Sequence, residues 1–380
     1  MKTNHAMRIA VLLIGALWGP GAALGTSAGP LYEGDLETQL AHARGVARWV
    51  DEPLSEADFG TGSQRFDGEW LFGTYVMGAI GHGQVALEHP EYRAEAGRRM
   101  ERAIDAALTR EVRAFDRAAW GTDPVDDIGT RRAHVAYLGY LDLALALHRQ
   151  VDPESKFIEL EESITRHLAG LLERSATGLV ETYPGEVYPV DNAAFIGALG
   201  VHDAVTGEDH RTLIRRFRAE LRGRYISAET GLLYQSVARR GGRPVDAARG
   251  SGTALATYFL AYADPELSEQ LWSAMRRELY RQGLGFGAMR EYAPGPGGRG
   301  DIDSGPVVLG LGVSATGFAI GAARAHGDRD AYRSLYATAA LFGAPTDAGG
   351  RMSFALGGPI GDAIMFAMLT APRAVARVRS

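Results

Sequence analysis

The 380-residue chain contains no cysteine. This absence excludes disulfide bonds, thiolate metal sites, a thiol nucleophile and a lipid-modified cysteine. The chain also has no long run of lysine or arginine, and its formal net charge is −6. Its arginines alternate with glutamates along expected helices, which is typical of solvated faces. We therefore expect no nucleic-acid partner.

Three further chemical signatures are missing or out of place. The one Gly-x-Ser-x-Gly match, at residues 25–29, lies near the N-terminus and not between a strand and a helix, so a serine hydrolase is not indicated. The glycine-rich run 294–300 lacks the Lys-Ser/Thr that follows it in a phosphate-binding loop. The histidines do not form clusters with metal-ligand spacing, and we expect structural roles for His82, His148, His202, His210 and His326. The sequence thus predicts no metal and no other cofactor.

Long apolar runs are scarce, and the clearest one lies near the N-terminus, at residues 9–18. It follows Lys2 and Arg8 and leads into small residues as far as Ala28, the pattern of a secretory signal. We expect residues 1–28 to be removed, a mature start near 26–29, and export to the periplasm or the extracellular space. The alternative is an uncleaved anchor, the one case in which a membrane partner is expected.

Alternating strand patterns are scarce too, and helical periodicity dominates residues 29–380, which we expect to form one domain. The pattern predicts about twelve helices. They cover residues 34–49, 67–87, 91–114, 131–150, 154–174, 191–205, 210–222, 251–261, 265–281, 306–325, 329–341 and 359–370.

The expected helices are joined alternately by short turns and long loops. Helices after a long loop, such as residues 71–79 and 307–313, are rich in Gly, Ala and aromatic residues, whereas those after short turns carry Arg and Glu on one face. A helix that is apolar nearly all round is buried, and an amphipathic one lies outside it. The sequence predicts an all-α (α/α)6 toroid with the long loops on one rim, at the N-terminal ends of the inner helices. The alternative is an open α-solenoid.

The loop at residues 181–192 is the most informative of these. It holds three carboxylates and two tyrosines among two prolines and a glycine, directly before an apolar helix. Acids and phenols on a constrained backbone suit acid–base chemistry, so Glu186, Tyr188 and Asp191 are catalytic candidates. The alternative is an ordinary helix start with Asp191 as N-cap and the tyrosines half-buried.

Other residues of the long loops complete the predicted rim. His134 and Asp303 are further catalytic candidates, although Asp303 also suits a cap before Pro306, and a lone helical histidine is often a core residue. The aromatic side chains gather in the long loops, which favours a concave pocket for sugar rings or hydrophobic chains. The predicted substrate-binding residues are Trp120, Asp123, Tyr137, Tyr183, Tyr234, Arg249 and Asp301.

Two stretches resemble the linalool dehydratase-isomerase family. One comprises residues 178–207, with Gly178-Leu179, Pro184-Gly185, Tyr188, Asn192 and Val201-His202-Asp203; the other has Trp120, Asp123-Pro124-Val125 and Tyr137-Leu138-Gly139-Tyr140. The resemblance implies an (α/α)6 toroid whose acids, tyrosines and cysteines protonate a tertiary alcohol and expel water. The family's cysteines would fall near Thr182 and Asp191. Without thiols, Asp191 beside Tyr188 is expected to transfer protons as an ionised base and a desolvated Glu186 as the acid.

Three functional classes follow. The first is an exported acid–base enzyme of lyase or isomerase type that acts on a small alcohol or terpenoid-like molecule. The second is a carbohydrate-active enzyme, a glycosidase or polysaccharide lyase, with Asp191 or Asp303 as acid and Trp120 and Tyr183 stacking on sugar. The third is a non-catalytic envelope binding protein. The expected partner is thus a small molecule or a sugar, and the oligomeric state is left open.

Overall fold

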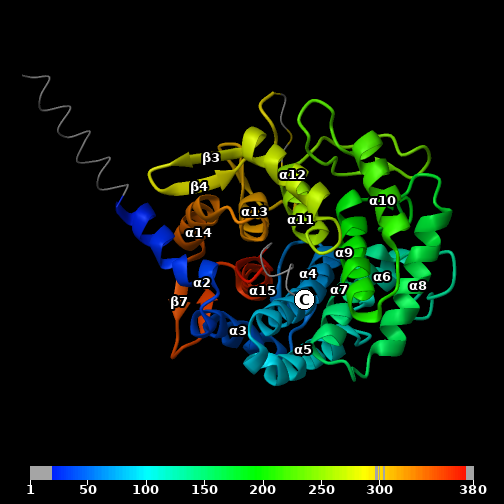
Figure 1. The fold of residues 1–380 in the computed structure, drawn as a ribbon, viewed down its shortest axis with the longest axis horizontal. Coiled ribbons are helices and arrows are strands. Elements are labelled where there is room, and N and C mark those ends of the chain that lie inside the picture. Colours follow the sequence, from blue (N-terminus) through cyan, green and yellow to red (C-terminus); the bar gives the residue numbers. More distant parts are fainter. Residues whose placement is uncertain (1–18, 296–297, 299, 303, 374–380) are drawn as a thin grey trace, which may run out of the picture.

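Six helices form a closed inner ring (Figure 1). The computed structural model describes residues 19–295, 298, 300–302 and 304–373. Each inner helix contacts the next, and the last returns to the first, so the predicted toroid is confirmed and an open solenoid is excluded. The ring consists of α4 (Gln64–Glu88), α7 (Val135–Val151), α9 (Pro189–Thr206), α11 (Gly250–Leu260), α13 (Val313–Ala325) and α15 (Gly358–Leu369).

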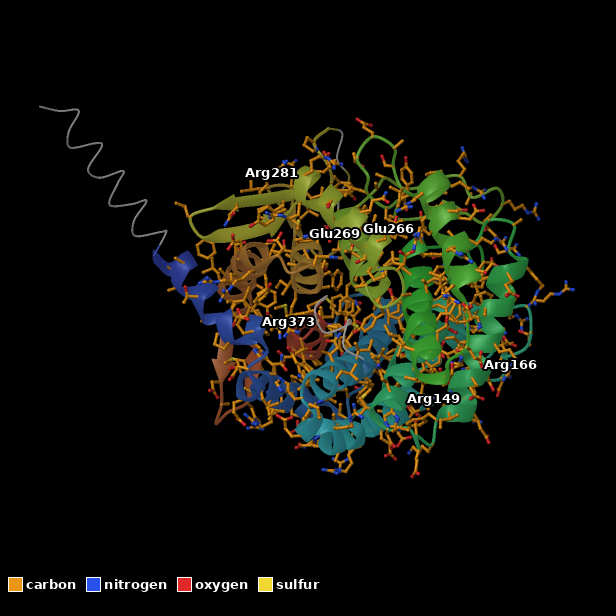
Figure 2. The ribbon with its side chains drawn as sticks, in the orientation of Figure 1. Arg149, Arg166, Glu266, Glu269, Arg281 and Arg373 are labelled. Carbon is orange, nitrogen blue, oxygen red and sulfur yellow. The ribbon has the colours of Figure 1, made fainter. Side chains whose placement is uncertain are left out.

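Outer helices alternate with the inner ones along the chain. They are α3 (Leu36–Asp51), α5 (Arg93–Ala107), α8 (Ile158–Arg174), α10 (Arg211–Glu220), α12 (Pro265–Glu278) and α14 (Arg329–Gly343). Helix α3 covers α15 and α4, and α5, α8, α12 and α14 each cover the inner helix that precedes them. Charged side chains such as Arg166 of α8 project from this outer layer (Figure 2). The amphipathic pattern thus assigned the two layers correctly.

Glycines allow the inner helices to approach one another closely. A Cβ added at Gly197 of α9 would lie 2.7 Å from the carbonyl oxygen of Phe259 in α11. One added at Gly200 would lie 2.7 Å from the carbonyl oxygen of Tyr262. Side chains at these two positions would therefore separate α9 from α11.

Polar contacts join α3 and α4, near the start of the chain, to α13 and α15, near its end. Asp362 of α15 accepts hydrogen bonds from Trp49 Nε1 of α3 at 2.9 Å and from the Phe354 amide at 2.6 Å. On the other face of the ring, the buried Arg324 of α13 donates to Glu88 at the end of α4 at 2.8 Å. Arg373 contacts both Glu88, at 2.9 Å, and Glu33, at 3.6 Å.

The long loops lie on one rim, where every inner helix begins. They carry short antiparallel strand pairs: β1 (Glu186–Val187) with β2 (Val237–Ala238), β3 (Tyr280–Gly283) with β4 (Phe286–Met289), β5 (Val307–Val308) with β6 (Leu311–Gly312), and β7 (Pro345–Asp347) with β8 (Met352–Phe354). The sequence did not reveal these pairs because strands this short cannot show a clear alternation.

Some helix boundaries differ from the predictions. The helix predicted from residue 131 begins at Val135, because His134 adopts a left-handed conformation with φ of 48°. The helix predicted from 306 begins at Val313, because β5 and β6 form a hairpin turning at Leu309 and Gly310. The helix predicted over 91–114 is divided among a 3₁₀ turn (Pro90–Tyr92), α5 and α6 (Ala114–Trp120). A short helix α2 (Gly29–Glu33) precedes α3.

The end of the segment predicted to be removed lies against the toroid. Arg333 of α14 donates to the carbonyl oxygen of Gly25 at 2.9 Å and to the Thr26 hydroxyl at 2.8 Å. In the part of the chain that the structure describes, no helix combines the length and the apolarity needed to cross a bilayer. Removal of residues 1–28, and export, stay predictions.

Candidate active site

Asp191 is held in the first turn of α9 by two neutral hydroxyl groups. Its Oδ1 accepts a hydrogen bond from Tyr140 of α7 at 2.8 Å, and its Oδ2 accepts one from Thr182 at 2.9 Å. Asn192 fixes the loop before the helix, since its side chain bonds both the amide and the carbonyl group of Val180. Residue 188 is the N-cap, so the alternative of Asp191 as the cap is wrong.

Burial raises the pKa of Asp191 to about 6, against the opposing hydrogen bonds from Tyr140 and Thr182. Burial thus opposes the ionisation that the helix N-terminus was expected to favour, and both forms of the carboxyl group are accessible near neutral pH. A carboxyl group with this pKa can hold a proton or release it near neutral pH. That property is what a general acid or base requires.

Glu186 and Tyr188 do not have the arrangement expected of them. The Glu186 side chain is 41% exposed and lies 3.5 Å from Arg65 of α4, so it is not the desolvated acid. The Tyr188 hydroxyl donates to Glu186 at 3.2 Å, whereas the tyrosine on Asp191 is Tyr140. Glu186 and Tyr188 thus form a second acid–phenol pair at the rim, separate from the pair of Asp191 and Tyr140.

Tyr183 and Glu69 form a third acid–phenol pair, near Asp191. Its hydroxyl donates to Glu69 of α4 at 2.5 Å, and Arg65 lies 4.8 Å above its ring. The side chain is 5% exposed. Burial, followed by the charge of Glu69, raises the Tyr183 pKa well above its usual value, and the charge of Asp191 contributes to the same shift. Residues from α4, α7 and α9 therefore converge at this part of the rim.

His134 is enclosed between two carboxylates. Its Nδ1 pairs with Asp116 at 2.5 Å, its Nε2 pairs with Asp127 at 2.9 Å, and its ring is fully buried under Trp120, with centroids 4.5 Å apart. Neither nitrogen is free to reach a substrate. The catalytic role expected of His134 is not supported by this geometry, which instead suits anchoring of the loop before α7.

Three of the predicted substrate-binding residues, Trp120, Asp123 and Tyr137, form contacts within the protein near His134. Tyr137 is completely buried and donates to the carbonyl oxygen of Ala107 at 3.0 Å, which makes it a core residue. Asp123 accepts from Arg113 Nε at 2.7 Å. Trp120 stacks on His134, so that face of its indole is not available to a sugar ring.

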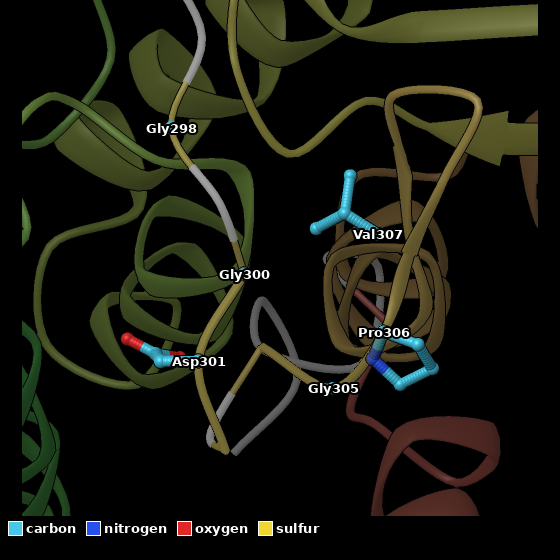
Figure 3. Close-up of a pocket in the computed structure, with 6 residues that line it drawn as sticks. All are labelled: Gly298, Gly300, Asp301, Gly305, Pro306 and Val307. Atoms are coloured by element: carbon cyan, nitrogen blue, oxygen red, sulfur yellow. The ribbon is translucent and has the colours of Figure 1, made fainter.

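Arg249 and Asp301 form a separate cluster at the start of α11. Arg249 is 5% exposed and donates to Glu291 at 3.1 Å and to Asp301 at 2.5 Å. Asp301 borders a hollow of about 370 Å³ whose other lining residues are Gly298, Gly300, Gly305, Pro306 and Val307 (Figure 3). The structure gives this cluster no contact with Asp191. Among the other candidates, Tyr234 is half-buried in the loop before α11, and Asp303 lies outside the described residues.

The opposite part of the rim is apolar and open. Val313 at the start of α13 is 57% exposed, and Leu356 just before α15 is 77% exposed. A Cβ added at Gly317 or Gly361, within the first two turns of the same helices, would meet no atom within 4 Å. The two adjacent helices α13 and α15 thus offer apolar side chains and free space at the rim.

Sequence reasoning missed Tyr140 as a partner of Asp191. Tyr140 stands six positions after His134, off the face that His134 and Tyr137 share. The available signal was Gly139: a Cβ there would lie 3.4 Å from the Asp191 carbonyl oxygen, so α7 approaches α9 closely at this point. Arg65 was missed as well, and Glu69 and Thr182 were not among the predicted site residues.

The fold and these side chains define an (α/α)6 toroid that bears a partly desolvated carboxyl and phenol cluster on its rim. A model of the linalool dehydratase/isomerase family matches residues 134–355, and the chain belongs to that family. The matched range contains Tyr140, Thr182 and Asp191, which confirms the resemblance seen in the sequence.

Other comparisons add little. No curated protein matches the chain. Among solved structures, a GH76 α-mannanase from Bacteroides thetaiotaomicron is similar with a TM-score of 0.45 and 9% sequence identity, covering 82% of this chain and 86% of that chain. This similarity is too low to bear on the activity.

Proposed function

We propose that the protein is an acid–base enzyme of the dehydratase type that removes water from a small, largely apolar alcohol. The observation that carries the proposal is the Asp191 carboxyl, half-buried at the start of an inner helix, with a pKa of about 6 and with hydroxyl groups as hydrogen-bond partners. Membership of the linalool dehydratase/isomerase family supports the same reaction class.

In the proposed reaction Asp191 acts first as the acid. Its proton passes to the substrate hydroxyl, the C–O bond breaks, and water leaves with the bonding electron pair. The carboxylate of Asp191 then lies beside the carbocation and takes a proton from the neighbouring carbon as the double bond forms. The alcohol is converted to an alkene and water, and Asp191 regains its proton. Return of water to the other end of an allylic cation would instead isomerise the alcohol.

Tyr140 and Thr182 serve this cycle by orienting the carboxyl group. Their hydrogen bonds favour the ionised form and burial favours the protonated form, so the two effects hold the pKa between the values for a buried and a free carboxyl. The positions at which the family resemblance places cysteines are near Thr182 and Asp191, and these two side chains are in direct contact. We propose that a carboxyl–hydroxyl pair replaces thiol chemistry in this chain.

The substrate class follows from the rest of the rim. The exposed Val313 and Leu356 and the free space beside Gly317 and Gly361 suit a hydrocarbon chain better than a hydroxyl-covered sugar. A glycosidase also needs two available carboxyl groups across the pocket. The rim carboxylates Asp123, Glu186 and Asp301 are each paired with an arginine, which disfavours that alternative.

The test is a substrate panel analysed by gas chromatography. Purified protein is incubated near pH 6 with tertiary and allylic terpene alcohols, with primary alcohols and with mannose- and glucose-based oligosaccharides. We expect alkene formation from a tertiary or allylic alcohol, and its loss in Asp191→Asn. Hydrolysis of an oligosaccharide without any alkene, or full dehydratase activity in Asp191→Asn, would overturn the proposal.

Export is proposed from the N-terminal pattern alone. Expression of the complete chain, followed by cell fractionation and N-terminal sequencing, tests it. A start at residue 26–29 in the exported fraction is the expected result. Cytoplasmic protein that retains Met1 would contradict it.

A further inference from the structure

The turn between α9 and α10, at the opposite end of α9 from Asp191, brings together two histidines and a glutamate. His202 lies in the last turns of α9, and Glu208 and His210 follow in the turn. One ligand atom from each of the three lies within 4.8 Å of the others. The sequence predicted structural roles for these histidines, because they lie near helix ends and turns and their spacing fits no familiar metal motif. In the structure the αL residue Gly207 turns the chain back between them.

Each histidine is already oriented for a ligand. His202 Nδ1 pairs with Glu161 at 2.5 Å, and His210 Nδ1 pairs with Asp203 at 2.6 Å. A carboxylate on one ring nitrogen fixes the tautomer and makes the other nitrogen a better metal ligand, an arrangement common around bound zinc. In both residues Nε2 is the nitrogen left for an ion.

His202 Nε2 supplies a second, independent observation. The residue is 1% exposed, and Nε2 is buried without a hydrogen-bond partner. A buried nitrogen of this kind is costly unless something binds it. Its neighbour is Glu208 Oε2 at 3.4 Å, too poorly aligned for a hydrogen bond. Two ligands bound tetrahedrally to one zinc ion lie about 3.3 Å apart, so this spacing fits a shared metal.

We infer that His202, Glu208 and His210 form a divalent-metal site, with Zn²⁺ as the ion that the ligand set fits best. Two imidazoles and one carboxylate are a known zinc ligand set, with a fourth position left for water. Glu208 is 60% exposed and the His210 side chain 21% exposed, so the ion can enter from solvent. Bound metal would tie the end of α9 to the start of α10. The site is independent of the proposed reaction on the rim.

The test is zinc binding by the complete, tag-free protein after dialysis against a chelator. Isothermal titration with Zn²⁺ should give one ion per chain, Zn²⁺ should raise the melting temperature, and Co²⁺ should give the visible spectrum of a tetrahedral site. Glu208→Gln and His210→Gln should each weaken zinc binding by at least about tenfold, as loss of a ligand or its support does.

Asp209→Asn is the matched control. Asp209 lies between two proposed ligands, is exposed, and pairs with Arg211 instead of the cluster. It should bind Zn²⁺ as the wild type does, and circular dichroism verifies that every variant is folded. The inference is overturned if the wild type binds no zinc stoichiometrically, or if Glu208→Gln and His210→Gln bind it as tightly as Asp209→Asn.

Discussion

In the proposed reaction one carboxyl group, that of Asp191, carries out both proton transfers. Its pKa of about 6 results from burial against two hydrogen bonds. If Asp191 donates the first proton, kcat/KM should be constant at low pH and fall about tenfold per pH unit above about 6. Asp191→Asn should lower kcat by about 10²-fold or more and remove this limb. A profile that rises above pH 6 would show that Asp191 begins the reaction as a base.

The hydrogen bond from Tyr140 gives a second prediction. It favours the ionised carboxylate, so Tyr140→Phe should move the descending limb of the pH profile to higher pH. Tyr137→Phe is the control, because Tyr137 lies one turn earlier and bonds the Ala107 carbonyl group. The role assigned to Tyr140 fails if the two variants have the same pH profile.

The same carboxyl group should make the protein less stable at high pH. The folded pKa, about 6, lies above the usual aspartate value of 3.8, so the folded state binds the proton more tightly. Its contribution to stability is fully present below pH 3.8 and is lost as the pH rises through about 6. At pH 8, Asp191→Asn should therefore raise the free energy of unfolding by about 1–3 kcal/mol.

Urea denaturation at pH 5 and pH 8 measures this effect. The gain in Asp191→Asn should be larger at pH 8, whereas Glu186→Gln, at a half-exposed residue paired with Arg65, should change stability little at either pH. Equal effects of Asp191→Asn at both pH values would contradict the prediction.

For single residues, the sequence predicted the loop that carries the candidate site, but not which side chains contact each other there. Residues 181–192 were identified because acids and phenols stand on a constrained backbone, and Asp191 lies at the centre of the observed group. Its partner could not be predicted, because Tyr140 lies on another helix and the rotation of α7 against α9 is set by packing. The enclosure of His134 was unpredictable for the same reason, since Asp116 reaches it from α6 and Asp127 from the loop that follows.

At the scale of single helices, the glycines are of two kinds: some lie where a neighbouring helix leaves no room for a side chain, and others face open space. Gly197→Ala should lower the free energy of unfolding by about 1–3 kcal/mol, because the new methyl group would meet the Phe259 backbone at 2.7 Å. Gly317→Ala is the matched control in another inner helix, where a Cβ meets nothing within 4 Å, and alanine should stabilise it by up to about 1 kcal/mol. Thermal unfolding compares the two, and equal changes would show that the ring is not closely packed at Gly197.

Helices were easier to predict than the segments between them. The spacing of apolar residues, and the difference in charge between inner and outer helices, identified both layers. Burial of one helix face requires apolar residues at a regular spacing within that helix, and this spacing can be read from the sequence. The rim hairpins and the late start of α13 left no such record, since their turns depend on backbone conformations such as φ of 53° at Leu309.

At the scale of the whole molecule, Glu88 and Arg324 join α4 to α13 across the end of α15. Glu88→Gln should lower the free energy of unfolding by about 3 kcal/mol at pH 7, because the guanidinium of Arg324 is buried. Burial raises the Glu88 pKa, but Arg324, Gln39 and Arg373 outweigh it and leave the pKa below 4.5. The pair therefore stabilises the fold above pH 4.5, and its contribution is lost as the pH falls through the folded pKa.

Urea denaturation at pH 7 and at pH 3 tests this prediction, with a smaller difference between wild type and Glu88→Gln at pH 3. Glu266→Gln is the control, since Glu266 is paired with arginines on the exposed face of α12 and should affect stability little. Equal losses in the two variants would mean that the contact between α4 and α13 does not hold the ring closed.

The contact between Glu33 and Arg373 has a topological consequence. Every other passage from an inner helix to the next outer helix is a short turn, and the passage from α15 to α3 is the one that the chain order interrupts. Ends of a ring that lie this close are what a circular permutation requires, and the short turns between inner and outer helices are the places where a permuted chain is expected to open.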